Sequence, residues 1–185
     1  MGNKEKIREE IKLLKKQLGQ EDRQSKSADI VSHIEQSGIF QSAKTVLLFS
    51  PLPDEPDISP LLVRYAKAKR VILPVVVGDN LILRQLYDLG SMSIGAFGIK
   101  EPSVGEFNDY SSIDLALIPG VAFDLLGNRT GRGKGYYDKL LCDDRFSNVL
   151  KIGCAFGFQI LENVPTRAHD VKMDGVVYES EIRFL

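Results

Sequence analysis

The feature that most constrains the fold of this chain is a series of continuous apolar runs separated by helical patterns. These runs are "KTVLLFS" (44–50), "RVILPVVV" (70–77), "IDLALIPG" (113–120) and "VLKIGCAFG" (149–157). A strand with one face in water alternates apolar and polar residues, whereas a strand buried on both faces is apolar throughout. Buried strands that alternate with helices are typical of a parallel sheet covered on both sides. The sequence therefore predicts an α/β fold with a mainly parallel sheet between helices.

Helical periodicity and weaker strand patterns fill the intervals between these runs. Ile7, Ile11, Leu14 and Leu18 recur at the spacing of one helical face, and Gly19 is a natural stop for that helix. By the same criteria we expect further helices over 22–37, 59–68 and 133–141, further strands over 81–86 and 175–180, and mostly loop over 90–112.

Composition narrows the class of protein. With 185 residues, 43% of them hydrophobic, the chain is long enough to form one globular domain over residues 1–185. A net charge of −1 gives no basic field of the kind that binds nucleic acid. Cys142 and Cys154 have neither zinc-site nor disulfide spacing, and no signal peptide or membrane-spanning run is present. We expect a cytoplasmic protein that binds neither nucleic acid nor membrane.

The chemistry of the chain is concentrated in one glycine-rich and basic stretch, "PGVAFDLLGNRTGRGKGYYDKLL" (119–141). It follows a predicted buried strand, and ligands of open α/β sheets bind beyond the carboxyl ends of the strands. Glycines let backbone N–H groups approach a ligand closely, and successive N–H groups before a helix form an anion site. Arg129, Arg132 and Lys134 add positive charge. The stretch is thus predicted to bind a phosphate chain.

The stretch nevertheless fails both common nucleotide fingerprints. A P-loop would need glycine at Asn128 and a hydroxyl at Gly135, and the dinucleotide pattern would need glycine at Tyr136. A mobile surface loop and an RNA-binding segment are the two alternative interpretations. The position between a buried strand and a helix speaks against the first, and the single occurrence and the net charge speak against the second.

Together with flanking motifs, this stretch resembles the signature of the 5-formyltetrahydrofolate cyclo-ligase (5,10-methenyltetrahydrofolate synthetase) family. The similarity extends to "KEKIR" near the N-terminus, "DEPD" after the first strand, "FGIKEP", and "VKMDGVVYE". It implies a fold of the NagB/RpiA/CoA-transferase kind. It also implies cyclisation of 5-formyltetrahydrofolate to 5,10-methenyltetrahydrofolate that depends on ATP and Mg²⁺ and releases ADP and phosphate through a phosphorylated formyl intermediate.

The resemblance also implies which residues bind the ligands. Lys4 and Arg8 lie on one face of the first helix, a spacing otherwise typical of solvated surface charge. The ATP-binding positions are Lys4, Arg8, Arg129, Thr130, Gly131, Arg132, Gly133, Lys134, Gly135, Tyr136 and Tyr137. The folate-binding positions are Glu55, Arg132, Gly133, Lys134, Gly135 and Tyr136. The magnesium ligands are Asp138 and Asp174, and the catalytic groups are Lys134, Arg132 and Tyr136.

Three positions depart from the family pattern, and two other functions stay open. Thr130 and Lys100 stand where leucine is usual, and Lys139 where arginine is common. The alternative functions are a sugar-phosphate isomerase or deaminase of the same broad fold, and a non-catalytic nucleotide- or folate-binding protein. Neither His33 nor His169 is expected to be catalytic. We expect a monomer, with a weak homodimer as the alternative.

Overall fold

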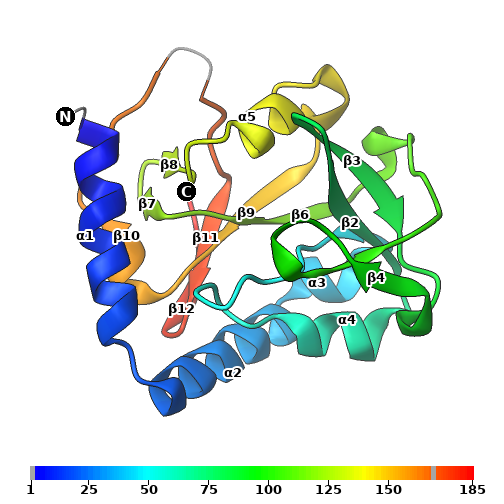
Figure 1. Cartoon of the computed structure of the whole chain (residues 1–185), viewed down its shortest axis with the longest axis horizontal. Coiled ribbons are helices and arrows are strands. Elements are labelled where there is room, and N and C mark those ends of the chain that lie inside the picture. The colour runs from blue at the N-terminus through cyan, green and yellow to red at the C-terminus, as the bar shows by residue number, and fades with distance from the viewer. Residues whose placement is uncertain (1–2, 168–169) are drawn as a thin grey trace.

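A central mixed sheet organises the computed structural model, which describes residues 3–167 and 170–185. Within these residues the strand order is β12-β11-β9-β6-β1-β2-β3 (Figure 1). The strands of this sheet are β1 (Thr45–Leu47), β2 (Arg70–Val77), β3 (Asn80–Gln85), β6 (Leu115–Pro119), β9 (Leu150–Cys154), β11 (Gly175–Tyr178) and β12 (Glu181–Phe184).

The centre of the sheet is parallel and its two edges are antiparallel. Strand β1 pairs in parallel with β2 and β6, and β9 pairs in parallel with β6 and β11. The edge strands β3 and β12 run antiparallel to their neighbours. The predicted α/β fold with a mainly parallel sheet is therefore confirmed. Because the central strands are parallel, the segments that follow β1 and β6 both leave the sheet at the carboxyl ends of its strands.

Helices cover both faces of the sheet, as Figure 1 shows, with α2, α3 and α4 on one side and α5 on the other. Helix α1 stands at one end, beside a small sheet formed by β10, β7 and β8. The bounds of these elements are α1 (Asn3–Gln17), α2 (Gln20–Gln36), α3 (Gly38–Ser42), α4 (Ser59–Tyr65), α5 (Tyr136–Leu141), β7 (Ala122–Asp124), β8 (Arg129–Thr130) and β10 (Ile160–Leu161). No helix of the described residues is both long and apolar enough to cross a membrane.

The apolar runs are explained by two cores that share the sheet between them. In β6, Leu115 and Leu117 pack with the helices on the α2 side. The intervening Ala116 and Ile118 pack with Leu140 and other residues on the α5 side. A strand covered on both faces needs apolar residues at every position, which is why these runs show no alternation.

The segment 90–112 is mostly without regular strands or α-helices, as predicted, but it contains one pair of short strands that was not predicted. This segment contains the antiparallel pair β4 (Met92–Ile94) and β5 (Lys100–Pro102). Both strands are short and partly exposed, so neither carries the apolar signal that marks a strand in sequence. At the tip between them, Phe97 has a backbone φ of 60° and its side chain is 58% exposed.

The first helix exists as predicted, but its buried face differs from the predicted one. Leu14 is 41% exposed, whereas the neighbouring Lys15 is 5% exposed. The physical reason is a partner that lies far away in sequence, because the Lys15 ammonium pairs with Asp54 in the loop after β1. The spacing of apolar residues alone had predicted Leu14, not Lys15, on the buried face of the helix.

Several predicted elements begin or end at other residues in the structure, and further short elements, among them β7, β8, β10, β12 and α3, were not predicted. Helix α5 begins at Tyr136 rather than near 133, because Gly133 and Gly135 have φ of 97° and 71°, which no right-handed helix accepts. The run 149–157 is a strand only to Cys154. After β11 the chain turns back into β12, which pairs with it.

Candidate active site

Three adjoining cavities lie around the loop after β1 and the glycine-rich loop. The central cavity, of about 450 Å³, lies between those two loops and includes Glu55 and Lys134 in its lining. The basic cavity, of about 380 Å³, lies between the glycine-rich loop and the start of α1. The outer cavity, of about 1060 Å³, opens on the other side of the loop after β1. Arg129, Gly131, Gly135 and Asp138 line both the central and the basic cavity.

The basic cavity brings together cations that are far apart in the sequence. Lys4 and Arg8 from α1 line it together with Arg129, and Lys139 and Arg167 add further positive charge. Arg8 Nε donates a hydrogen bond of 2.9 Å to the Gly131 carbonyl, so the first helix is tied directly to the glycine-rich loop. Such a concentration of cations beside glycine backbone suits a phosphate chain.

Two carboxylates share this cavity with the cations. Asp170 accepts a 2.5 Å hydrogen bond from Lys4 Nζ. Asp138 pairs with Arg129, whose guanidinium is buried and also donates to the Pro119 carbonyl. Burying a charge is costly unless it is paired, so these contacts offset the burial of Arg129 and Lys4.

The central cavity contains a chain of alternating charges. Arg132 donates to Glu55 Oε1 through Nε at 3.1 Å and through Nη2 at 2.9 Å. Its Nη2 also contacts Asp54 Oδ1 at 2.5 Å, and Lys15 Nζ lies 3.3 Å from Asp54 Oδ2. Glu55 is 6% exposed, and its other oxygen accepts from the Leu52 N–H at 3.0 Å. This network fixes the Glu55 carboxylate at the wall of the cavity.

The pKa values of this network follow from burial and partner charge. Burial lowers the pKa of Lys15, and Asp54 opposes that shift. Burial alone would raise the pKa of Asp54, but the hydrogen bond and charge of Arg132 and the charge of Lys15 outweigh it and lower that pKa. Both Asp54 and Arg132 are therefore held in their charged forms at neutral pH.

The remaining loop side chains differ in their exposure. Lys134 is exposed and lines the central cavity. The Tyr136 hydroxyl donates a long hydrogen bond of 3.4 Å to the Gly78 carbonyl, so its ring borders the same cavity. Tyr137 packs against the core on the α5 side and near the Arg129 guanidinium, and burial raises its pKa. Gly133 lines the basic cavity with its backbone.

Two residues expected at the site lie elsewhere. Thr130 is fully buried, lines none of the three cavities, and its hydroxyl has no hydrogen-bond partner among the described residues. Asp174 precedes β11, and its carboxylate accepts from the Lys151 N–H at 2.7 Å, at the amino ends of these parallel strands. Asp138 lies beyond the carboxyl end of β6, at the opposite edge. Asp170, close to Asp174 in sequence, lines the basic cavity together with Asp138.

The carboxylates of the basic cavity suit a magnesium ion that is also bound by phosphate and water, rather than a metal ion held by protein ligands alone. Among residues 3–167 and 170–185 no group of three or more His, Cys, Asp or Glu is arranged to hold a metal ion. Magnesium in nucleotide sites commonly takes one or two carboxylates and completes its octahedron with phosphate oxygens and water. The pair Asp138 and Asp170 fits that donor set.

Sequence reasoning missed Lys15 and Asp54 and gave Asp170 no role. A lysine within an amphipathic helix is ordinarily a solvated charge, and only the contact across the fold shows otherwise. The one available signal was the cluster of acids in "PDEPD", of which only Glu55 was singled out. His33 contacts the Glu179 carbonyl away from these cavities. His169 lies outside the described residues.

Comparisons with known proteins are consistent with this geometry. The model of the 5-formyltetrahydrofolate cyclo-ligase family matches residues 1–179. A 5-formyltetrahydrofolate cyclo-ligase of Haemophilus influenzae is 30% identical over 177 residues, covering 92% of this chain and 94% of the relative.

Two solved structures share the fold. The 5,10-methenyltetrahydrofolate synthetase of Aquifex aeolicus has a TM-score of 0.87 and 37% identity, covering 98% of this chain and 92% of its own. A 5,10-methenyltetrahydrofolate synthetase of Mycoplasma pneumoniae has a TM-score of 0.78 and 23% identity, covering 97% and 100%, and it supports the fold alone.

Proposed function

This chain belongs to the 5-formyltetrahydrofolate cyclo-ligase family, and we propose that it converts 5-formyltetrahydrofolate and ATP into 5,10-methenyltetrahydrofolate, ADP and phosphate with the help of Mg²⁺. The observation that carries the proposal is that the glycine-rich loop lines both the central and the basic cavity, so that the two share a wall. One cavity is basic and suits phosphates, and the other is lined by a buried carboxylate and aromatic rings and suits a pterin. No observation in the described residues favours the isomerase or the non-catalytic binding protein. We further propose that residues 1–185 act as one cyclo-ligase domain.

The reaction needs a way to remove the formyl oxygen. Loss of hydroxide from a formamide is prohibitive, so the formyl oxygen first attacks the γ-phosphorus of ATP, and the bond to the ADP oxygen breaks. The neighbouring amine nitrogen then attacks the activated formyl carbon and forms the second C–N bond of the ring. Phosphate leaves with the former formyl oxygen, and the attacking nitrogen loses its proton. Positioning and charge stabilisation are what such a phosphoryl transfer requires of the protein.

Cations of the glycine-rich loop and α1 have distinct roles in this scheme. Lys4, Arg8 and Arg129 hold the phosphate chain in the basic cavity, with the backbone of Gly131, Gly133 and Gly135 close to it. Lys134 is exposed within the central cavity and is free to turn towards the transferring phosphoryl group. A lysine there stabilises charge that develops only in the transition state.

Glu55 recognises the pterin. Its carboxylate is buried and its position is fixed by Leu52 and Arg132, so it can accept hydrogen bonds from the N–H groups of a reduced pterin with little loss of freedom. Arg132 contacts Glu55 on one side and borders the reacting groups on the other. Tyr136 supplies an aromatic face at the same cavity.

Magnesium would neutralise charge on the phosphates, and carboxylates of the basic cavity would hold it. Asp138 is the first of these, as the family resemblance implies. For the second we propose Asp170, because it lines the same cavity, while Asp174 is bonded to the start of β9. The role of Asp174 as a metal ligand stays a prediction from the family resemblance.

The experiment that tests both parts of this proposal is a magnesium titration of product formation. Wild-type protein with ATP and 5-formyltetrahydrofolate should form the methenyl product, followed by its ultraviolet absorbance. Asp138→Asn and Asp170→Asn should raise the magnesium concentration needed for half-maximal rate, by about tenfold or more. Asp174→Asn should instead lower the free energy of unfolding and leave that midpoint alone. Folded wild-type protein without product would refute the function. A shifted midpoint in Asp138→Asn and Asp174→Asn, with none in Asp170→Asn, would instead support the ligand pair that the family resemblance implies.

A further inference from the structure

The basic cavity holds more positive charge than the proposed reaction has used so far. Among the described residues, five cations and two carboxylates line it, and the proposed roles account for Lys4, Arg8 and Arg129. The other two cations are Lys139, in α5, and Arg167, in the segment between β10 and β11. Figure 1 shows this segment in orange, beside the N-terminal end of α1. Arg167 therefore reaches the cavity from a part of the chain that has no role in the site so far.

Arg167 differs from the other four cations in its contacts. Each of the four is bonded within the protein: Lys4 to Asp170, Arg129 to Asp138, Arg8 to the Gly131 carbonyl, and Lys139 to the Asp79 carbonyl. The Arg167 side chain is exposed and lines the cavity. In the part of the chain that the structure describes, its guanidinium forms neither a hydrogen bond nor an ion pair.

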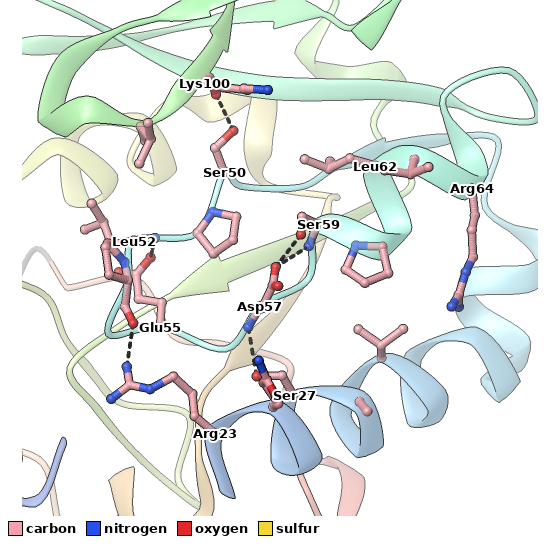
Figure 2. A pocket seen from close by; sticks show the side chains of 18 of the residues that line it. Arg23, Ser27, Ser50, Leu52, Glu55, Asp57, Ser59, Leu62, Arg64 and Lys100 are labelled. Carbon is pink, nitrogen blue, oxygen red and sulfur yellow. Dashed lines mark hydrogen bonds between the residues drawn. The ribbon is translucent and has the colours of Figure 1, made fainter. Parts of the chain in front are cut away.

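The arginines of the other two cavities are also bonded within the protein. Figure 2 shows Arg23 of the outer cavity directed at the loop after β1, where it donates to a backbone carbonyl. Arg64 of the same cavity pairs with Glu35 through two contacts of 2.8 Å. Arg132 of the central cavity is bonded to two carboxylates. Of the arginines that line the three cavities, Arg167 is thus the one whose guanidinium has no partner within residues 3–167 and 170–185.

Hydrogen bonds on both sides of Arg167 hold its backbone in place. Before it, the Val164 N–H donates to Asp124 Oδ2 at 2.8 Å, and the buried Val164 side chain packs against α1. After it, Asp170 Oδ2 accepts from the Arg167 N–H at 2.7 Å and from Lys4 Nζ at 2.5 Å. The backbone of Arg167 is therefore tied to the helix that brings the first cations to the cavity, while its guanidinium is left for a ligand.

The position of Arg167 indicates which part of a phosphate chain it would contact. Arg129, Gly131, Gly135 and Asp138 line both the basic and the central cavity, whereas Arg167 lines the basic cavity alone. In the proposed reaction, the γ-phosphate is transferred at the wall that the two cavities share. A cation that lines only the basic cavity is therefore placed for the phosphates that remain in ADP.

We propose that Arg167 is a further nucleotide-binding residue, which contacts the phosphates that remain in ADP. This inference rests on the proposed function. A guanidinium offers parallel N–H donors that match two phosphate oxygens. Because these phosphates are not transferred, the contact is the same before and during the chemical step. Such a contact strengthens the binding of ATP without lowering the barrier of that step, unlike the proposed contact of Lys134 with the transferred group.

The first measurement is the binding of ADP and of inorganic pyrophosphate, followed by calorimetry at one Mg²⁺ concentration and without folate. Arg167→Gln should weaken the binding of both by roughly threefold to fivefold, the size expected of one solvent-screened contact between charges. Arg167→Lys keeps the charge without the planar fork, so its affinities should lie between those of wild type and Arg167→Gln. Arg70→Gln is the matched control. It removes the same charge from an exposed arginine at the start of β2, outside the three cavities, and should bind like wild type.

The second measurement is the steady-state kinetics of the same proteins. Arg167→Gln should raise KM for ATP by a similar factor, with kcat and KM for 5-formyltetrahydrofolate as in wild type. Equal binding of ADP and pyrophosphate by wild type and Arg167→Gln would overturn the inference, as would an equal loss in Arg70→Gln or a fall in kcat at unchanged KM for ATP. Weaker binding of ADP alone would place Arg167 at the nucleoside and would overturn it too. If wild type has no turnover, the proposed function fails, while the binding of ADP and pyrophosphate still decides the role of Arg167.

Discussion

Arg132 and Glu55 illustrate how single side chains set the chemistry of this site. Each lies beside the other at the central cavity, and the two hydrogen bonds from Arg132 offset the cost of burying the Glu55 carboxylate. A pterin that bonds to Glu55, as proposed, would meet a carboxylate whose direction is already fixed. Pre-organised charge of this kind is what lowers a barrier in a partly dry site.

A substitution of Lys134 can distinguish a catalytic role of this residue from a structural one. Its side chain is exposed and borders the central cavity, so Lys134→Ala should change the free energy of unfolding by less than about 0.5 kcal/mol. If it stabilises the transferring phosphoryl group, kcat should fall by about 10²- to 10³-fold. Steady-state kinetics and urea unfolding of the same preparation measure both, with Lys67→Ala as control. A comparable loss of stability would show that the loop needs Lys134 to fold.

Asp124, at the end of β7, accepts hydrogen bonds from the start of the glycine-rich loop, and it should make the stability of the protein depend on pH. Burial alone would raise its pKa, but the Asn128 side chain and the N–H groups of Val164, Asn128 and Leu126 outweigh burial and hold the pKa below its usual 3.8. A carboxylate with a depressed folded-state pKa adds stability above the unfolded value, and that stability is lost as pH falls through the folded value.

The corresponding variant is Asp124→Asn, which cannot titrate and loses acceptor oxygens. At neutral pH it should be less stable than wild type by about 2 kcal/mol or more. Between about pH 5 and pH 2 its free energy of unfolding should fall less steeply than that of wild type. Urea unfolding across this pH range provides the comparison, and parallel curves for the two proteins would exclude Asp124 as a source of the acid sensitivity.

At the scale of elements, α1 completes the site although it is remote from the glycine-rich loop in sequence. Its first turns bring Lys4 and Arg8 to the basic cavity, and its later part brings Lys15 to the loop after β1. Arg8 and Lys15 thus tie one rigid helix to the phosphate side and to the pterin side of the site.

The link between α1 and the loop after β1 can be measured by a double-mutant cycle. Lys15→Met and Asp54→Asn should each lower the free energy of unfolding, because each leaves a partly buried charge with fewer partners. The double variant should lose less than the sum of the two, with a coupling of about 1 kcal/mol. Additive losses in urea unfolding would mean that the 3.3 Å contact contributes nothing to the docking of α1.

The sequence predicted the sheet because doubly buried strands leave an unmistakable apolar run, and it predicted the glycine-rich loop because its residue types are unusual. It failed where a contact across the fold decides the outcome. Lys15 is buried through Asp54, and β4 and β5 are short strands without an apolar pattern. Asp170 and Asp174 are four residues apart, and only the position of each relative to the sheet separates them.

For the whole molecule, the fold places three adjoining cavities around the loop after β1 and the glycine-rich loop, and the buried Glu55 lines two of them. In the proposed function, the basic cavity binds the phosphates and the central cavity binds the pterin with its formyl group. In the proposed reaction, the formyl oxygen lies where the glycine-rich loop borders both of these cavities. The central claim is that the formyl oxygen meets the γ-phosphate of ATP at this border.

The most direct test of that claim follows the formyl oxygen. 5-Formyltetrahydrofolate labelled with ¹⁸O in the formyl group is incubated with wild-type protein, ATP and Mg²⁺, and the phosphate released is analysed by mass spectrometry. One labelled oxygen should appear in each phosphate formed, in step with the methenyl product. Methenyl product accompanied by unlabelled phosphate would contradict the account, because the formyl oxygen would then have left without meeting the γ-phosphate.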